Sequence, residues 1–306
     1  MSAPLPSWND GAARRALLDF VDAVTTDGAS SFVRPEDRVA VFDNDGTLWS
    51  EQPMYVQAHF VVDRLRELAP AHPEWRKQQP FQALIEGDEE ALRKLTEHDA
   101  AALIAATHAG MTTGEFSRTA KAWLATAKHP RFQRPFTHCI YQPMLELLDL
   151  LRTHGFDLHI VSGGGIDFLR AFSEETYGIP SSHVIGSSGK THFDLRDGQP
   201  VLVKLPGLTS LDDGEGKPIN IHLHIGKRPV LAFGNSDGDL QMLQYAGSGD
   251  GPRLRLLLHH DDAVREYAYD REAKTGRLDR ALDVAGKDGW TVVSMRSDWN
   301  QVFPQG

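Results

Sequence analysis

Three short apolar runs constrain the fold of this chain more than any other feature of its sequence. They lie in residues 38–42, 158–161 and 230–233, and each is followed at once by polar residues or glycine. Apolar runs of this length with little polar alternation are typical of strands that are buried on both faces, as in parallel sheets. Helical patterns separate the runs, and one of them begins at Pro143 and ends at Gly155. The sequence therefore predicts an α/β fold built around a parallel sheet.

A long segment interrupts this alternation of strands and helices. Within residues 50–135 the apolar side chains recur at helical spacing, and strand patterns are absent. We therefore predict an all-helical cap domain over residues 50–135, inserted into a core domain formed by residues 1–49 and 136–306. Residues 193–196 and 201–205, joined around Asp197 and Gly198, predict a β-hairpin appended to the sheet.

Composition and charge exclude several functional classes. A chain of 306 residues with 41% hydrophobic content can bury a substantial core. The net charge of -10 argues against a general affinity for nucleic acid or anionic membranes, although a local basic pocket can still bind a small anion. Cys139 is the single cysteine, which excludes an internal disulfide and a cysteine-ligated zinc site. No run of about 18 apolar residues is present, and charged residues replace the apolar centre of a signal peptide near the N-terminus. We expect a cytoplasmic protein, with an exported form that has lost its signal as the alternative.

The polar segments after the three strands are expected to meet, because ligands bind beyond the carboxyl ends of parallel strands. The first segment contains Asp43 and Asp45 within a stretch that alone would indicate only a turn. The second segment is Ser162 with three glycines before a predicted helix, which offers a hydroxyl and backbone N–H groups to an anion such as phosphate. The third segment, residues 234–239, is rich in the side-chain oxygens that suit Mg²⁺.

A phosphate site also requires a cation. Lys217 is the preferred candidate, because it opens the predicted helix before the third strand and can point back at the site. Lys204, on the predicted hairpin, is the main alternative.

These segments, taken in order, resemble the haloacid dehalogenase-like superfamily, in its phosphoserine-phosphatase-like branch with a helical C1-type cap. Residues 43–47 match the family's DxDxT motif, Ser162 and its glycines the second motif, Lys217 the third, and residues 234–239 the fourth. The resemblance covers nearly the whole chain. It implies a Rossmann-like core and a Mg²⁺-dependent phosphatase that hydrolyses a small phosphorylated metabolite through an aspartyl-phosphate intermediate.

The resemblance also implies roles for individual residues. Asp43 would attack phosphorus, and Asp45 would transfer the proton to and from the reacting oxygens while its backbone carbonyl contacts Mg²⁺. The phosphoryl group would be bound by Thr47, Ser162, Gly163 and Lys217. Glu51 lies close to the position at which phosphoserine phosphatases carry an acid that meets the substrate's amine. The alternative for Glu51 is an exposed acid at the start of the cap.

The fourth motif departs from its commonest form, because Asn235 stands where the first metal-ligating Asp is usual. The expected Mg²⁺ ligands are Asp43, Asp45, Asn235 and Asp239, with Asp237 as the alternative to Asn235. A neutral ligand weakens metal binding, which keeps the first of two alternative functions open; the second uses the same aspartyl phosphate with an acceptor other than water. One is a catalytically weak protein that binds a phosphorylated ligand, and the other is a phosphotransferase. The expected partner is a small phosphorylated substrate, without nucleic acid or membrane, and the oligomeric state is not predicted.

Overall fold

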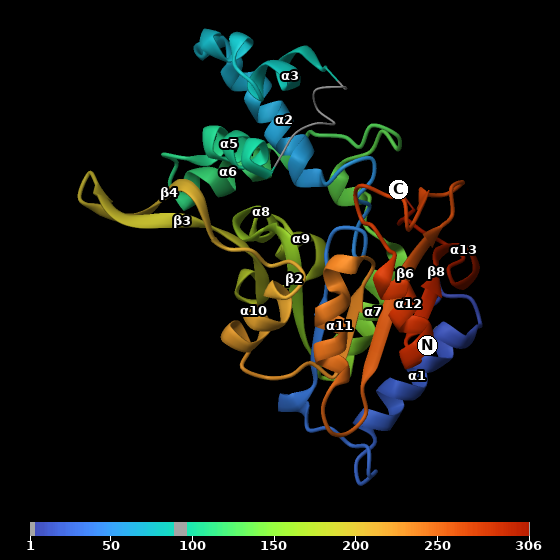
Figure 1. Ribbon diagram of the computed structural model, residues 1–306. Coiled ribbons are helices and arrows are strands. Elements are labelled where there is room, and N and C mark those ends of the chain that lie inside the picture. The colour runs from blue at the N-terminus through green and yellow to red at the C-terminus, as the bar shows by residue number, and fades with distance from the viewer. Residues whose placement is uncertain (1–3, 89–96, 306) are drawn as a thin grey trace.

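A mostly parallel sheet forms the centre of the molecule (Figure 1). The computed structural model describes residues 4–88 and 97–305, in which the strands pair in the order β4-β3-β2-β1-β5-β6-β7, with β8 beside β6. Their bounds are β1 Val39–Phe42, β2 Asp157–Gly165, β3 Val184–Arg196, β4 Gln199–Ser210, β5 Leu231–Gly234, β6 Leu254–Asp261, β7 Ala268–Tyr269 and β8 Thr291–Ser294. Phe42 is aligned with Ile160 of β2 and with Phe233 of β5, in parallel register on both sides. The carboxyl ends of the three strands therefore lie close together, which confirms the predicted α/β fold.

Helices cover both faces of the sheet, and β1 shows how the side chains divide between them. Ala40 and Phe42 belong to an apolar cluster that includes α1 (Ala12–Thr25) and α7 (Gln142–Thr153). Val39 and Val41 belong to a second cluster, which includes α10 (Gly216–His224), α11 (Leu240–Gly247) and α12 (Arg280–Asp288). All four residues of β1 are buried, which explains why the apolar run does not alternate. The remaining short helices beside the sheet are α8 (Ile166–Arg170), α9 (Ser173–Tyr177) and α13 (Met295–Asp298).

A group of helices lies beyond the carboxyl ends of the strands, at the top of Figure 1. It consists of α2 (Val56–Leu68), α3 (Phe81–Glu86), α5 (Glu97–His108) and α6 (Thr113–Leu124). α2, α3 and α5 share a small apolar cluster around Leu65, Trp75 and Leu84, whereas the buried side chains of α6 belong to the cluster that includes α1 and α7. Phe60 of α2 also packs on Phe168 of α8, with ring centroids 5.4 Å apart, so the group is anchored to the sheet region. In the described part of the predicted cap segment, no strand is present.

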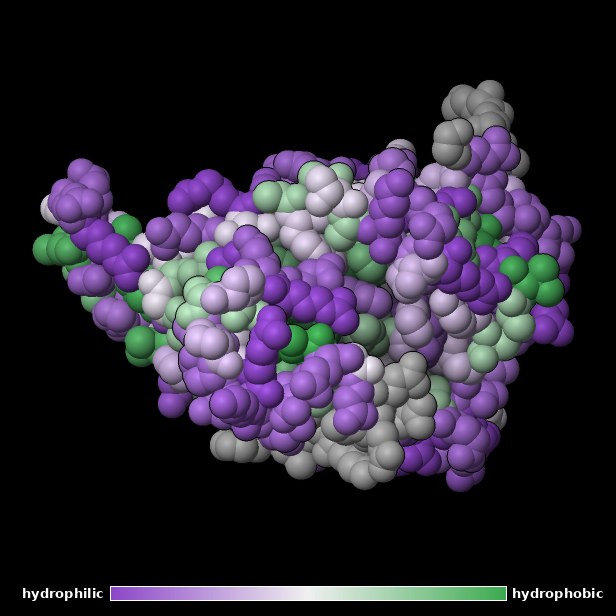
Figure 2. Space-filling view, turned by 90° about the horizontal axis from the view of Figure 1, so that it is seen from above, coloured by the Kyte–Doolittle hydropathy of each residue, from purple (hydrophilic) through white to green (hydrophobic). Residues whose placement is uncertain are grey.

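The predicted hairpin is present, but it is longer than predicted and continuous with the sheet. β3 pairs with β2 as far as Ser187 and then continues as one arm of a hairpin with β4. Asp197 and Gly198 both have positive φ at the turn, as a tight hairpin requires. The hairpin projects to the left in Figures 1 and 2, and its exposed apolar side chains contribute to the green surface at that end of Figure 2. Those side chains are Phe193, Leu195, Leu202, Leu205 and Leu208.

Two local predictions need correction. Residues 162–165 were expected to form a segment after the second strand, but they extend β2, with a shift of register against β3 between Ser162 and Gly165. The helix predicted after the three glycines is divided into α8 and α9. Among the described helices, none has both the length and the apolar character needed to cross a bilayer.

Candidate active site

The three polar segments meet at the carboxyl ends of neighbouring strands, as predicted. Asp43 follows β1, Ser162 lies near the end of β2, and Asn235 follows β5. The backbone N–H of Asp43 donates a hydrogen bond to the carbonyl of Phe233 (3.0 Å), which fixes the first segment against the third. A cavity of about 570 Å³ opens above them, and Asp43, Asp45, Ser162 and Gly163 line it. Its volume is in the range of roughly 300–1,000 Å³ found for small-molecule sites.

Lys217 lies at the bottom of this cavity, in the first turn of α10. Its ammonium group donates to Asp43 Oδ1 (2.7 Å), Asp239 Oδ1 (2.5 Å) and the carbonyl of Val161 (2.9 Å). Burial alone would lower the pKa of Lys217, but the carboxylates of Asp239 and Asp43 outweigh it and raise that pKa, which keeps the ammonium charged. Lys204, the alternative, forms an ion pair with Asp167 instead. Lys217 is therefore the lysine that contacts Asp43.

Asp43 is a buried carboxylate with an unusual electrostatic environment. Burial raises its pKa well above the usual range, and the negative charge of Asp239 raises it further, while Lys217 acts in the opposite direction. Its Oδ1 atom is bound to Lys217, and within the described part of the chain Oδ2 accepts no hydrogen bond. One oxygen is thus held in place, and the other is available to a ligand in the cavity.

Asp45 lies beside Asp43 with its side chain fixed by Trp49. The indole Nε1 of Trp49 donates to Asp45 Oδ1 (2.8 Å). Burial raises the pKa of Asp45, although the hydrogen bond from Trp49 opposes the shift. A carboxyl group with a raised pKa holds a proton more readily near neutral pH, which suits a general acid.

Asn235, Thr47 and Glu51 form a connected network behind Asp43. Thr47 Oγ1 donates to Asn235 Oδ1 (3.1 Å), and Asn235 Nδ2 donates to Glu51 Oε1 (2.7 Å). The hydroxyl of Tyr269 donates to the same Glu51 oxygen (2.8 Å). Gly46 has a φ of +79°, and a Cβ atom there would overlap the side chains of both Asn235 and Glu51. The first segment therefore requires glycine at this position.

Glu51 is buried, with 1% of its surface exposed, so the alternative of an exposed acid is wrong. Burial raises its pKa well above the usual value, and the hydrogen bond from Tyr269 opposes this only in part. Glu51 also lines the cavity, close to Asp43 and Asp45. Thr47, in contrast, is fully buried and is outside the set of described residues that line the cavity. It supports Asn235 rather than facing a ligand.

The two remaining acids of the fourth motif face other partners. Asp239 Oδ1 binds Lys217, and Asp239 Oδ2 accepts hydrogen bonds from the backbone N–H groups of Asn235 (2.9 Å) and Ser236 (3.0 Å). Both of its oxygens are engaged, so Asp239 positions Lys217 and the loop instead of facing the cavity as a metal ligand. Asp237 Oδ1 accepts from the backbone N–H groups of Asp279 and Ala281. It therefore stabilises the start of α12 and does not replace Asn235.

Ser162 and the glycines after it form the opposite side of the polar floor. Ser162 is 1% exposed, and its Oγ accepts a hydrogen bond from the backbone N–H of Gly164 (3.2 Å). The N–H of Gly165 donates to Gln57 of α2 (2.7 Å), which ties this segment to the helical group above it. Ser162, Gly163 and Gly164 all line the cavity.

Several lining residues were not predicted from the sequence. Asp213 and Ser236 lie at the polar end, and apolar residues of α2, α3 and α5 form the upper wall. The proximity of Asp213 to Lys217 in the sequence was an available signal. Tyr269, which bonds Glu51 but lies outside the described cavity lining, had no such signal, because no local sequence pattern surrounds it.

The donor set at the floor fits Mg²⁺. The carboxylate of Asp43 and the backbone carbonyl of Asp45 would supply oxygen ligands, which Mg²⁺ prefers. Asn235 is buried outside the described cavity lining, and its Oδ1 accepts from Thr47 but has a second lone pair that a metal could use. Among the described residues that line the cavity, Lys217 is the single lysine or arginine, whereas Asp43, Asp45, Glu51 and Asp213 are acidic. The raised pKa of Asp43 shows that its negative charge is unfavourable in this buried position. A bound divalent cation would make that charge less unfavourable.

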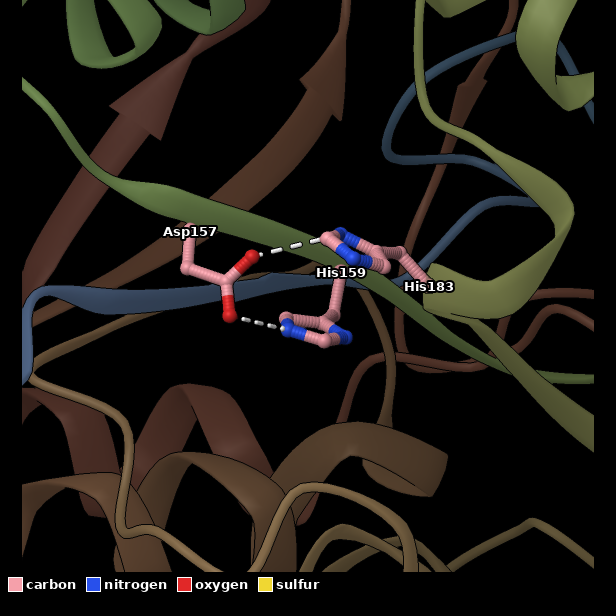
Figure 3. A group of neighbouring side chains, drawn as sticks. All are labelled: Asp157, His159 and His183. Carbon is pink, nitrogen blue, oxygen red and sulfur yellow. Dashed lines mark hydrogen bonds and ion pairs between the residues drawn. The ribbon is translucent and has the colours of Figure 1, made fainter. Parts of the chain in front are cut away.

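A second group of metal-ligating side chains lies away from the cavity (Figure 3). Asp157 binds the ring nitrogens of His159 (2.9 Å) and His183 (3.2 Å), and the two rings stack with centroids 4.5 Å apart. One ligand atom from each residue lies within 4.8 Å of the others. Asp157 is aligned with Val39, at the amino end of β1, so the group belongs to the other end of the sheet from Asp43. Imidazole ligands also suit Zn²⁺ better than Mg²⁺.

Comparison with solved structures identifies the fold. A functionally unknown protein from Anaerococcus prevotii is 18% identical, with a TM-score of 0.55, over 81% of this chain and 85% of that one. A protein of unknown function from Bordetella pertussis is 17% identical, with a TM-score of 0.50, over 84% of this chain and 97% of that one. These likenesses show a shared fold and no more.

Two kinds of sequence comparison differ greatly in coverage. A probable periplasmic serine endoprotease DegP-like from Chlamydia trachomatis is 38% identical over 65 residues, which are 21% of this chain. This chain spans only 12% of that curated relative, so its activity is not transferred. The model of the haloacid dehalogenase-like hydrolase family, in contrast, matches residues 40–244. This match covers more than half of the chain and includes the segments that meet at the cavity. The chain therefore belongs to the haloacid dehalogenase-like hydrolase family.

Proposed function

We propose that this protein is a Mg²⁺-dependent phosphatase that hydrolyses a phosphomonoester through an aspartyl phosphate on Asp43. One observation carries the proposal. The carboxylate of Asp43 is held by Lys217 at the bottom of a cavity, with one oxygen free and with Asp45 beside it. Family membership and the phosphoserine-phosphatase-like motif pattern support the same reaction class.

In the first half of the reaction, the free oxygen of Asp43 attacks the phosphorus atom of the bound ester. The bond between phosphorus and the ester oxygen breaks, and the leaving oxygen takes a proton from Asp45. Lys217 stabilises the charge of the transferring group, because it is fixed and desolvated before the substrate binds. Ser162 and the backbone of Gly163 border the same space and are proposed to bind phosphoryl oxygens.

In the second half, water attacks the phosphorus atom of the aspartyl phosphate. Asp45, now ionised, takes a proton from that water, and inorganic phosphate and the free Asp43 carboxylate are released. Mg²⁺, held by Asp43, Asn235 and the Asp45 carbonyl, would neutralise phosphate charge in both steps. Asn235 brings no charge of its own to the metal, and we propose that Glu51, hydrogen-bonded to Asn235, compensates for this.

The test is hydrolysis of 4-nitrophenyl phosphate with and without Mg²⁺. We compare the native protein, Asp43→Asn, and Asp37→Asn as a matched control, because Asp37 is a surface residue paired with Arg34 and Lys227. The proposal predicts metal-dependent turnover in the native protein and in the control, and none in Asp43→Asn. It is wrong if Asp43→Asn retains full activity, or if the native protein shows no turnover with Mg²⁺, Mn²⁺, Co²⁺ or Zn²⁺.

A further inference from the structure

The cavity above Asp43 has two chemically different parts. Its floor carries the charged groups, whereas its upper wall is formed by apolar side chains of the helical group. The wall includes Val61 and Val62 from α2, Leu84 from α3, and Leu103 and Ile104 from α5. A phosphoryl group bound at Asp43 would therefore present the rest of the substrate to an apolar surface.

The charges in the cavity exclude a second anionic group on the substrate. Among the described lining residues, Lys217 is the single lysine or arginine, and it is already bonded to Asp43 and Asp239. Asp213, also at the floor, adds a further negative charge. A carboxylate or second phosphate on the released alcohol would meet no positive partner there and would lose its hydration.

A cationic group is also poorly matched to the cavity. Glu51 lies close to the position at which an acid would meet a substrate's amine, but its Oε1 already accepts hydrogen bonds from Asn235 and Tyr269, so only Oε2 is open to an ammonium group. An ammonium group would also have to leave water next to the apolar wall.

Within the described residues, Val61, Leu84 and Leu103 of the wall are buried, whereas Ile104 and two apolar residues beside the wall are partly exposed. Ile104 of the wall is 39% exposed, and Met54 (36%) and Leu211 (60%), which lie outside the three wall helices, also line the cavity. Covering such surface is favourable, by about fourfold in affinity for each methylene that a ligand buries. The volume of about 570 Å³ leaves room for such a group beside the phosphate.

We propose that the alcohol released by this enzyme is uncharged and largely apolar, as in an alkyl or aryl phosphate, and that the wall formed by α2, α3 and α5 selects it. This inference rests on the proposed phosphatase function, and it adds the class of substrate. The shape and polarity of the wall then determine which ester is bound, and the residues of the floor hydrolyse it.

The first test is kcat/KM for ethyl, butyl and hexyl phosphate, together with O-phosphoserine and phosphocholine. The proposal predicts that kcat/KM rises along the alkyl series, by up to about fourfold per methylene, and that both charged esters fall below hexyl phosphate. A flat or falling series overturns it, and so does a preference for phosphoserine or phosphocholine.

A binding measurement separates this inference from the proposed function. Alkyl phosphonates cannot be hydrolysed as esters, so calorimetric titration with ethyl and hexylphosphonate reports on the wall without catalysis. Tighter binding of hexylphosphonate without any turnover of phosphate esters would show that the wall selects an apolar ligand, and it would refute the phosphatase. Equal binding of the two phosphonates, in an active enzyme, would refute only the substrate class.

Variants locate the effect on the wall. Ile104→Glu is expected to reduce the hexyl-to-ethyl ratio of kcat/KM by about tenfold, and Ile104→Ala by a smaller factor. Leu223→Glu is the matched control, because Leu223 is 67% exposed on α10 and lies outside the described cavity lining. This control should leave the ratio unchanged. An unchanged ratio in folded Ile104→Glu would contradict the assignment.

Discussion

The floor and the upper wall of the cavity are built on opposite principles. The floor, at the ends of β1, β2 and β5, holds buried charges that are fixed by many hydrogen bonds, as at Lys217 and Asp239. The wall, from α2, α3 and α5, consists of apolar side chains, of which Val61, Leu84 and Leu103 are buried and Ile104 is exposed. The floor is costly to fold and leaves little freedom for substitution, because a buried charge needs its partners. Because the floor is proposed to carry out the reaction and the wall to select the substrate, substitutions should be able to alter each property separately.

The largest effect is expected from Lys217→Met, which removes the cation of the floor and leaves the wall residues unchanged. The substitution leaves Asp43 and Asp239 buried without their shared cation, so kcat/KM should fall by about 10³-fold or more for every ester. The free energy of unfolding should fall by about 3–5 kcal/mol. Lys204→Met is the matched control, because Lys204 pairs with Asp167 on the hairpin side. Steady-state kinetics and thermal unfolding measure both effects, and similar activity losses in the two variants would contradict the assignment of Lys217.

Asp45→Asn should distinguish the floor from the wall. Its effect should depend on the acidity of the leaving group, as expected for a residue of the floor, and not on the size of that group. The variant cannot protonate an alkoxide, so hydrolysis of butyl phosphate should slow by about 10²-fold or more. The loss for 4-nitrophenyl phosphate should be smaller, because nitrophenolate leaves without a proton. Equal losses for the two esters would show that Asp45 is not the acid.

Substitutions that change the charges of Asn235 and Glu51 are expected to have an intermediate effect, on the Mg²⁺ concentration that the enzyme requires. Asn235→Asp alone places two carboxylates against each other, because Asn235 Nδ2 lies 2.7 Å from Glu51 Oε1. The double variant Asn235→Asp with Glu51→Gln keeps one charge and restores a hydrogen bond. We expect the Mg²⁺ concentration for half-maximal activity to be about tenfold lower in the double variant than in Asn235→Asp alone. Additive effects of the two substitutions would disprove the coupling.

The smallest effect concerns stability alone. The pKa of Glu51 is raised in the folded protein above its unfolded value, so between the two values the folded state binds more protons, and stability falls as pH rises. Glu51→Gln removes this cost. In metal-free buffer it should stabilise the protein by on the order of 1 kcal/mol at pH 8, and by less at pH 4. Denaturant unfolding at both pH values measures the difference, with exposed Glu36→Gln as the control. A gain that is larger at pH 4 would contradict the sign.

The sequence predicted the floor better than the wall, for a physical reason. Asp43, Ser162 and Lys217 lie next to strands or helix starts whose local patterns are strong, so their convergence follows from the parallel sheet. The wall residues Val61, Leu84 and Leu103 are far apart in the sequence, and only tertiary packing shows that they face one cavity. Long-range hydrogen bonds likewise decide that Glu51 is buried and that Asp239 faces Lys217. Residues 162–165 joined β2 because pairing with β3 overrides the turn preference of glycine.

The covalent step on Asp43 is the central claim, and trapping it is the most direct measurement. The native enzyme is mixed with hexyl phosphate and Mg²⁺, quenched in acid within one turnover, and digested for mass spectrometry. The account predicts a phosphate on the peptide that contains Asp43, attached to that aspartate, and its loss in Asp43→Asn. Turnover of the ester without any phosphate on Asp43, or with phosphate on another residue, would contradict the account.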